Sequence, residues 1–567
     1  MQINIDSQIY NVDEGKTILE VCIKNNIYVP YLCYHPDIEH NAKCRMCIVE
    51  VNNKIETSCN TIIKKDMVVK TNTDQINKFR KLNLNLLLSN NKKLFDDNTK
   101  DIMVIAKKLG MTKEELRFKE LEKKELSVCA SLCRDNSKCI LCGKCVQKCQ
   151  EIQGVDAIGT GHRSNKTEIC SVFEKLIDEV ACTFCGQCTN VCPTGAISER
   201  NYLQEVKDAI NDQNKIVLVQ TAPATRVTIG ETQGMPPGSL ITGKMVAALR
   251  RLGFNKVLDT NFGADLTIME EGTELIGRIQ NKGIFPMITS CCPGWIKFIE
   301  HFFPEQLEHL SSCKSPHQMF GAVAKTYYAK KNNFDPKNIV VVSIMPCTAK
   351  KFEAQRPEMK NLGLKDVDYV LTTRELGDWL NSENIKLSEL PDEFYNPILG
   401  VSSGAGAVFG ATGGVMEAAL RTVADILERK DLDKLDYTEV RGMQGIREAS
   451  LKIAGMDINV AIAHDLKNAR KIMQDIKDGK SKYHFIEIMA CPGGCIGGGG
   501  QPIPTTQEII KKRASAIYHQ DAILPIRKSH KNPEIIALYK EFLDAPGSDI
   551  AHKMLHTSYK KRNEFGD

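Results

Sequence analysis

Hydrophobic residues in the larger, C-terminal part of the chain form short continuous runs separated by stretches of helical periodicity. The runs lie at 215–220, 284–289, 339–345, 458–463 and 484–489. Such runs are typical of strands buried on both faces of a parallel sheet, and the helical stretches between them provide the crossovers that βαβ units require. The pattern predicts an α/β domain with parallel sheets over residues 206–505.

The N-terminal part has other patterns. Residues 1–75 alternate in strand fashion and contain a short helical stretch at 17–24, whereas residues 76–126 are rich in Leu, Lys, Glu and Asn with helical periodicity. A chain of 567 residues is too long for one core. We therefore expect a multidomain α+β and α/β protein. Its predicted parts are 1–75, a helical connector at 76–126, a cysteine-dense part at 127–205, the α/β domain at 206–505 and a charged helical tail at 506–567.

Three of the apolar runs lead into cysteine motifs. These are TSCCPGW at 289–295, MPCTAKK at 345–351 and EIMACPGGCIG at 487–497. Because ligands of open α/β sheets collect beyond the carboxyl ends of the strands, we expect these thiols to meet at one buried place. That arrangement is typical of a metal cluster held by the core of a domain.

Cysteine is the unusual component, with 22 residues. The chain begins without a charged and then apolar leader and contains no apolar stretch of spanning length, so we expect a cytoplasmic protein with no membrane partner. In a reducing compartment, repeated CxxC spacing indicates metal binding or catalysis. The net charge of +5 counts cysteines as neutral, and cluster thiolates would cancel it, so we expect no nucleic-acid partner.

Residues 127–205 contain the spacing CxxCxxCxxxC twice. This spacing matches bacterial ferredoxins, in which the fourth cysteine ligates the other cluster. The first 4Fe-4S cluster is expected at Cys139, Cys142, Cys145 and Cys192, and the second at Cys182, Cys185, Cys188 and Cys149. Zinc is the alternative for an isolated CxxC, but two interlocked units disfavour it.

Four further cysteines lie in residues 1–75. They are Cys33, Cys44, Cys47 and Cys59. Their spacing is less diagnostic, but it resembles the β-grasp ferredoxin module at the front of large redox enzymes. We expect a 2Fe-2S cluster here, with structural zinc as the alternative.

The three motifs and the order of the ferredoxin modules resemble the FeFe (iron-only) hydrogenases over residues 1–505, and the tail looks like the family's small subunit. The resemblance implies reversible reduction of protons to H₂ at an H-cluster, a 4Fe-4S cubane joined to a two-iron unit that carries CO, cyanide and a bridging dithiolate amine. It also implies ferredoxin or flavodoxin as the electron partner, since the chain has no nicotinamide module, and hydrogenase maturation enzymes as assembly partners. The implied cubane ligands are Cys292, Cys347, Cys491 and Cys495.

The same resemblance assigns a proton relay. Cys291 would pass protons to the bridging amine, and the relay would continue through Glu271, Ser311, Glu274 and Arg278. The spacing of Glu271, Glu274 and Arg278 places them on one face of a helix, although without the resemblance this pattern usually marks a solvated surface.

Further residues are expected around the two-iron unit. Lys350 would place a cation beside a cyanide, and Met345 and Met489 would pack against the unit unless they are ordinary core methionines. Two positions depart from the family pattern, namely Ala224, where a serine can bind a cyanide, and His317, where glutamine is expected. Histidine titrates near neutral pH and could tune the site, and a neutral, packed histidine is an equal alternative.

One electron inlet of fuller relatives is expected to be missing. Those relatives carry a 4Fe-4S cluster bound by one histidine and three cysteines, whereas residues 84–126 of this chain contain neither residue type. The thiols of Cys22, Cys129, Cys133 and Cys170 stay without an assigned role. Two other functions remain as alternatives, a cytosolic iron-sulfur assembly protein and a sensory hydrogenase.

Overall fold

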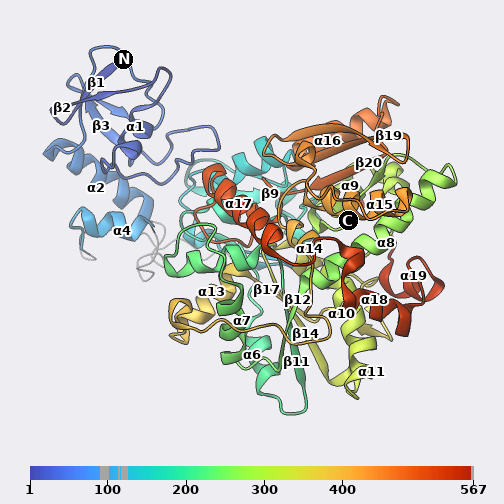
Figure 1. The fold of residues 1–567 in the computed structure, drawn as a ribbon. Helices are drawn as coiled ribbons and strands as arrows, with labels where there is room; N and C mark the ends of the chain where they lie inside the picture. The colour runs from blue at the N-terminus through green and yellow to red at the C-terminus, as the bar shows by residue number, and fades with distance from the viewer. Residues whose placement is uncertain (90–100, 113–114, 116–125, 564–567) are drawn as a thin grey trace.

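The computed structural model describes residues 1–89, 101–112, 115 and 126–563, and an N-terminal domain stands beside a larger body (Figure 1). The N-terminal domain has a five-stranded sheet of order β2-β1-β5-β3-β4. Its strands are β1 (Gln2–Ile5), β2 (Gln8–Asn11), β3 (Ile48–Val51), β4 (Lys54–Thr57) and β5 (Val68–Lys70). The predicted helical stretch is α1 (Ile18–Lys24), which begins with a capping box between Thr17 and Glu20.

Two helices are described in the predicted connector. They are α2 (Asp74–Leu88) and α4 (Asp101–Lys108), and both contribute buried side chains to a core that includes Met46. The helical prediction is confirmed for these segments, while its parts at 90–100, 113–114 and 116–125 lie outside the described residues.

The cysteine-dense part is mostly loops held by short elements. Three strands form one sheet and two form a hairpin: β6 (Ser127–Val128), β7 (Leu132–Arg134) and β10 (Ile197–Glu199), then β8 (Ile158–Gly161) and β9 (Glu168–Ser171). Helix α5 (Lys144–Gln147) follows Gly143, whose φ of 82° suits glycine.

The large domain contains two four-stranded sheets. The first is parallel throughout, with the order β12-β11-β14-β17. Its strands are β11 (Ile216–Thr221), β12 (Lys256–Asp259), β14 (Ile339–Met345) and β17 (Tyr369–Thr372). One face packs against α6 (Leu203–Asn211), α7 (Thr242–Arg251) and α13 (Thr373–Ser382), and the other against α8 (Thr260–Gln280) and α10 (Pro316–Val323).

The second sheet has the order β13-β20-β19-β18 and is parallel except for its β18–β19 hairpin. Its strands are β13 (Met287–Ile288), β18 (Ile446–Ile453), β19 (Met456–His464) and β20 (Phe485–Met489). It lies between α15 (Gly414–Glu428) on one face and α9 (Pro293–Phe302) with α16 (Leu466–Lys477) on the other. Helix α8 contributes Leu266 to the core of the first sheet and Ile268 to that of the second.

The strand predictions hold with two corrections. The run at 284–289 forms a strand only at Met287–Ile288, since Pro286 cannot donate a ladder hydrogen bond. Strands β12, β17 and β18 were not predicted. The three strands that lead into cysteine motifs belong to both predicted parallel sheets, β14 to the first and β13 and β20 to the second.

The tail wraps the large domain as helices α17 (Gln507–Ile523), α18 (Pro533–Leu538) and α19 (Asp549–Leu555), drawn in red in Figure 1. Helix α17 packs on α14 (Gly404–Val408), while Leu543 and Leu555 are fully buried in the core around α8 and α10.

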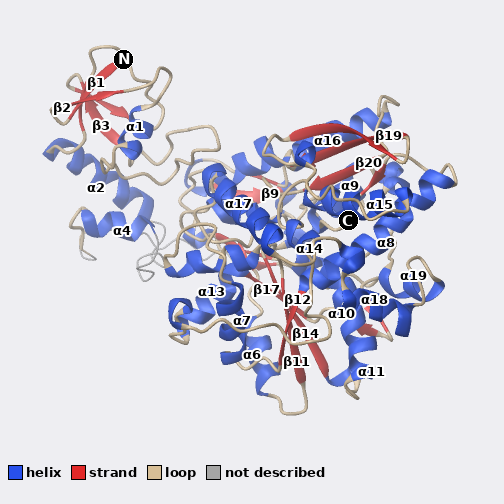
Figure 2. Cartoon of the chain, in the orientation of Figure 1, coloured by secondary structure: helices blue, strands red, loops and turns tan. Residues whose placement is uncertain are grey.

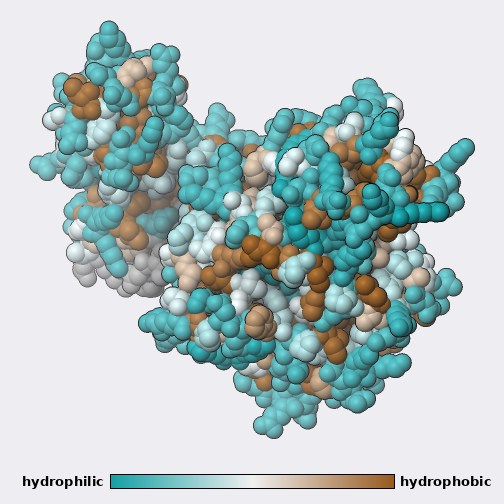
Figure 3. Space-filling view, in the orientation of Figure 1, coloured by the Kyte–Doolittle hydropathy of each residue, from teal (hydrophilic) through white to brown (hydrophobic). Residues whose placement is uncertain are grey.

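The large domain also contains the shorter helices α11 (Ala329–Lys331) and α12 (Ala349–Glu353). Helices cover both sheets (Figure 2), and the face in Figure 3 is largely hydrophilic with a hydrophobic band across the large domain. None of the described helices combines the length and apolarity that a bilayer span needs.

Candidate active site and electron relay

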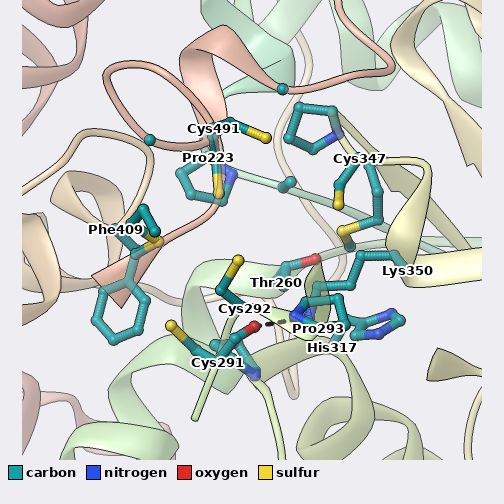
Figure 4. A pocket seen from close by; sticks show the side chains of 18 of the residues that line it. Pro223, Thr260, Cys291, Cys292, Pro293, His317, Cys347, Lys350, Phe409 and Cys491 are labelled. Atoms are coloured by element: carbon teal, nitrogen blue, oxygen red, sulfur yellow. Dashed lines mark hydrogen bonds between the residues drawn. The ribbon is translucent and has the colours of Figure 1, made fainter. Parts of the chain in front are cut away.

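A cavity lies where β13, β14 and β20 lead into their cysteine motifs. Cys291 lines it together with four further cysteines, which form one set: Cys292, Cys347, Cys491 and Cys495. Figure 4 shows the labelled members of this set turned toward the cavity from different segments. The structure therefore brings together the four cysteines that the sequence predicted to meet.

The four thiols fit an iron-sulfur cubane by their chemistry. Burial and neighbouring cysteines raise the pKa of Cys491, and burial is the main cause that raises the pKa of Cys495 to about 12. Without a metal, ionising four neighbouring buried thiols is unfavourable. A bound metal cation deprotonates the thiols and its positive charge stabilises the resulting thiolates. Thiolate donors also select iron-sulfur clusters over hard cations.

The cavity wall contains most of the other predicted residues. Met345, Met489, His317 and Lys350 line it, together with three residues outside the predicted motifs, Thr260, Pro223 and Phe409. Ala224 does not appear in the wall; it is fully buried behind it, in a small core with Ile496 and Ile517.

Glu353, which no sequence motif indicated, hydrogen-bonds to two of the wall residues. Its Oε2 lies 2.6 Å from His317 Nε2 and accepts a hydrogen bond from Lys350 Nζ at 2.9 Å. Lys350 also donates to the Cys291 carbonyl at 3.1 Å (Figure 4). Burial alone would raise the pKa of Glu353, but Lys350 and His317 hold it at about 2. A buried cation at the cavity is thus balanced by a carboxylate.

His317 is neutral near pH 7. Burial and the charge of Lys350 lower its pKa to about 4, and Glu353 opposes them only in part. This favours the neutral, packed histidine over a group that titrates near neutral pH.

Cys291 and Glu271 lie on the inner side of the predicted relay. Cys291 lines the cavity, and burial and then Glu271 raise the pKa of its thiol. Burial, with a contribution from Glu274, raises the pKa of Glu271 to about 8, which the Ser311 hydroxyl and the Ser290 N–H offset only in part. Among the described residues, neither carboxyl oxygen of Glu271 has a hydrogen bond of good geometry. Glu271 can therefore hold a proton at neutral pH.

The outer relay residues form a hydrogen-bonded group. Glu271, Glu274 and Arg278 all lie on α8, as their spacing predicted. Glu274 accepts from Ser311 Oγ at 2.9 Å and from Arg278 at 2.7 Å. The side chain of Arg278 is 16% exposed, so the group reaches from the buried Glu271 to the surface.

The ferredoxin-type cysteines assemble as the interlocked spacing predicts. One pocket is lined by Cys139, Cys142, Cys145 and Cys192, so the fourth cysteine of the second unit joins the first three of the first unit. Thiols of the complementary set interact with each other: Cys149, Cys182, Cys185 and Cys188. The four cysteines of the N-terminal domain interact likewise: Cys33, Cys44, Cys47 and Cys59.

These sets follow one another toward the cavity. Cys44 packs in one core with Cys142, and Gln147 donates to the Glu39 carbonyl at 2.9 Å, which joins the N-terminal domain to the first ferredoxin set. At the other end, the Cys491 thiol lies 4.0 Å from the Cys185 carbonyl. The structure therefore offers a single line of thiol sets from the N-terminal domain to the cavity.

Comparisons with known proteins agree with this architecture. Residues 215–499 match the family described as iron only hydrogenase large subunit, C-terminal domain, and residues 507–562 match iron hydrogenase small subunit. Residues 1–74 match a 2Fe-2S iron-sulfur cluster binding domain, and residues 138–196 match a 4Fe-4S dicluster domain.

Two curated relatives match over nearly the whole chain. NADP-reducing hydrogenase subunit HndD of Solidesulfovibrio fructosivorans is 44% identical over 100% of both chains. Iron hydrogenase 1 of Clostridium pasteurianum is 42% identical over 97% of this chain and 98% of its own. A solved [FeFe]-hydrogenase structure from a study of stepwise H-cluster assembly is 42% identical, with a TM-score of 0.58 over 64% of this chain and 99% of its own.

Proposed function

The chain belongs to the FeFe (iron-only) hydrogenase family, and from this premise we propose that it interconverts protons, electrons and H₂ at the cavity of Cys292 and its three partner cysteines. The observation that carries the proposal is that five cysteines line one cavity. Four of them suffice as cluster ligands, so the fifth, Cys291, is free to transfer protons. An assembly protein needs no such fifth thiol and no relay behind it.

The cysteines Cys292, Cys347, Cys491 and Cys495 would hold the cubane of an H-cluster. When bound, the cluster supplies the metal site for H₂ chemistry, while the protein supplies orientation, charge, protons and electrons. Lys350 provides the positive charge at the wall, fixed by Glu353, and Met345 and Met489 keep the surroundings apolar. These residues exclude water around the site, which strengthens the electrostatic effect of Lys350.

Protons would move between solvent and the cavity through Cys291, Glu271 and Glu274. Burial keeps Glu271 neutral near pH 7, so it can donate a proton toward Cys291 and recover one from Glu274 by way of Ser311. Arg278 fixes Glu274 by a hydrogen bond of 2.7 Å.

Electrons would enter at the 2Fe-2S cluster of the N-terminal domain and pass through two 4Fe-4S clusters to the cavity. The support is that Cys44 and Cys142 pack in one core at one end and that the Cys491 thiol lies 4.0 Å from the Cys185 carbonyl at the other. Residues 84–126 contain no histidine or cysteine that could bind a further cluster, so electrons would enter the relay only at the 2Fe-2S cluster. The inventory of one 2Fe-2S, two 4Fe-4S and a six-iron H-cluster corresponds to about 16 irons per chain.

The electron partner is proposed to be ferredoxin or flavodoxin. The similarity to a subunit of an NADP-reducing hydrogenase raises the alternative that a companion subunit carries the nicotinamide chemistry. The chain alone should then reduce ferredoxin with H₂ and fail to reduce NADP⁺. We place the protein in the cytoplasm, where reduced thiols persist, because none of its described cysteines pairs in a disulfide.

Gas evolution tests the function directly. Anaerobically purified protein, produced together with hydrogenase maturation enzymes, should evolve H₂ from reduced viologen dye. The matched control is Cys291→Ser, which keeps all four proposed cluster ligands and should lose most of the activity. Absence of H₂ from protein that holds about 16 irons and CO bands would contradict the proposal.

A further inference from the structure

The C-terminal tail places a histidine beside the outer end of the relay. We propose that His556 receives protons from Glu274 through the hydroxyl of Ser312 and returns them to solvent, so that it is the outermost carrier of the relay. The inference rests on the proposed function, because it presupposes that protons reach Glu274 from the cavity.

Arg278 is a poor terminal carrier even though it reaches the surface. Its guanidinium donates to Glu274 Oε1 at 2.7 Å and to the carbonyls of Leu310 and Ile284 at 2.8 and 3.2 Å. A guanidinium is not deprotonated in proteins, so it can orient Glu274 and balance its charge but cannot pass a proton onward. The outward step therefore needs another group next to Glu274.

Ser312 and His556 provide that group. Ser312 Oγ lies 3.4 Å from Glu274 Oε2 and 2.8 Å from His556 Nδ1. The backbone fixes this arrangement, since Ser312 O accepts from Thr557 N at 2.7 Å and Cys313 pairs with His556 as an isolated β-bridge. The tail is thus held in register against the segment that follows the relay serine, Ser311.

Glu270 sets the protonation of the imidazole ring. His556 Nε2 lies 3.0 Å from Glu270 Oε2, which also accepts from Gly547 N at 2.9 Å, and the other oxygen accepts from the Tyr539 hydroxyl. An ionised carboxylate only accepts hydrogen bonds, so Nε2 carries the hydrogen. The lone pair of Nδ1 then faces the hydroxyl of Ser312, as a proton acceptor must.

The transfer moves one proton and no electrons. The carboxyl proton of Glu274 goes to Ser312 Oγ as the hydroxyl proton of Ser312 goes to His556 Nδ1. The resulting imidazolium lies against the Glu270 carboxylate, which stabilises its charge.

The groups that face His556 come from several elements. Glu270 and Glu274 lie on α8, and His552 lies on α19. Cys313 lies in the loop before α10, and Tyr539 begins the π-helical segment that follows α18. The His552 ring stacks on that of His556 with centroids 4.5 Å apart, and the His556 side chain is 6% exposed. This small exposed fraction is where the proposed relay would return its proton to solvent.

The test compares variants of the full, matured enzyme in the dye assay. His556→Ala should lower turnover by at least about tenfold, less than the roughly 10²–10⁴-fold range for a group that acts on the reacting atoms because His556 lies at the outer end of the relay, and added imidazole should restore much of the loss. Ser312→Ala should cause a similar loss that imidazole does not restore, since the bridge to Glu274 is then missing. His552→Gln is the matched control, because its exposed side chain stacks on His556 and, among the described residues, makes no hydrogen bond to the relay, while its backbone bond to His556 N is kept; it should keep the parental rate.

A readout independent of turnover is the ¹⁵N spectrum of histidine-labelled protein. The signal that is lost in His556→Ala should be that of a ring protonated at Nε2 and unprotonated at Nδ1. The opposite tautomer would overturn the proposal, as would a rate of His556→Ala within about twofold of the parent or a loss that imidazole leaves untouched. Glu271→Gln separates the proposed relay from the proposed role of His556. If Glu271→Gln stays fully active, the relay itself is wrong. If Glu271→Gln is inactive while His556→Ala is fully active, protons leave Glu274 by another path.

Discussion

Replacement of Glu271 by glutamine tests the inner step of the relay. The carboxyl is fully buried and its pKa is raised from 4.5 to about 8. At 1.36 kcal/mol per pKa unit, this shift means that ionisation costs about 5 kcal/mol more at this buried position than it does for an exposed carboxyl. Glutamine keeps the size and the polarity of the neutral acid but cannot release or accept the relayed proton.

We expect Glu271→Gln to lower H₂ evolution by about 10²–10⁴-fold, the range for loss of a positioned acid–base group. The assay is dye-driven turnover between pH 6 and 9, together with infrared titration of the carboxyl band that the substitution removes. That band should vanish with an apparent pKa near 8, the value that burial imposes on the carboxyl.

The pH dependence of the unfolding free energy provides a second test of the raised pKa. Because the folded-state pKa lies above the unfolded value, the Glu271 carboxyl does not destabilise the fold through ionisation below about pH 4.5, and this destabilisation grows as the pH rises to about 8. The glutamine variant lacks this destabilisation, so its stability relative to the parent should increase with pH across that window.

The matched control is Asp265→Asn. Asp265 lies on the same helix, is fully buried and has a pKa that burial raises to about 6, yet it bonds Ser403, Ser529 and Asn532 rather than the relay. It should retain most of the activity. A Glu271→Gln rate above about one tenth of the parent, or an equal loss in Asp265→Asn, would refute the assignment of Glu271 as a specific carrier.

Three other predictions follow from the site. Cys291→Ser should lower turnover by at least about 10²-fold while the CO and cyanide infrared bands remain, and loss of the bands would instead make Cys291 structural. His317→Gln should leave the pH profile between pH 6 and 9 unchanged, since the pKa of about 4 keeps the ring neutral there; a shift of the profile would restore the tuning hypothesis. Cys44→Ser should remove the 2Fe-2S electron paramagnetic resonance signal and lower ferredoxin-driven turnover at least about tenfold with less effect on dye-driven turnover, and undiminished ferredoxin-driven turnover would contradict the single inlet.

The sequence predicted those parts of the molecule that short-range patterns encode. Apolar runs identified β11, β14, β19 and β20, and cysteine spacing identified which thiols share a site. Both signals are local, because a buried strand or a cluster loop is recognisable within about ten residues.

Residues that depend on long-range packing were missed. Glu353 follows a predicted motif by only two residues, yet its role comes from His317 on α10. His556 reaches Ser312 across 244 residues, and no periodicity in the tail indicates that contact. Ala224 was predicted to lie beside the two-iron unit, but its neighbour Pro223 lines the cavity instead. A difference of one residue depends on the exact path of the backbone, which the sequence pattern does not encode.

The infrared spectrum of anaerobically matured protein tests the central claim most directly. If Cys292, Cys347, Cys491 and Cys495 hold an H-cluster, the spectrum will contain CO and cyanide bands in a sample with about 16 irons per chain. A sample that carries its iron-sulfur clusters and the full set of maturation enzymes but lacks these bands would contradict the account and favour an iron-sulfur carrier.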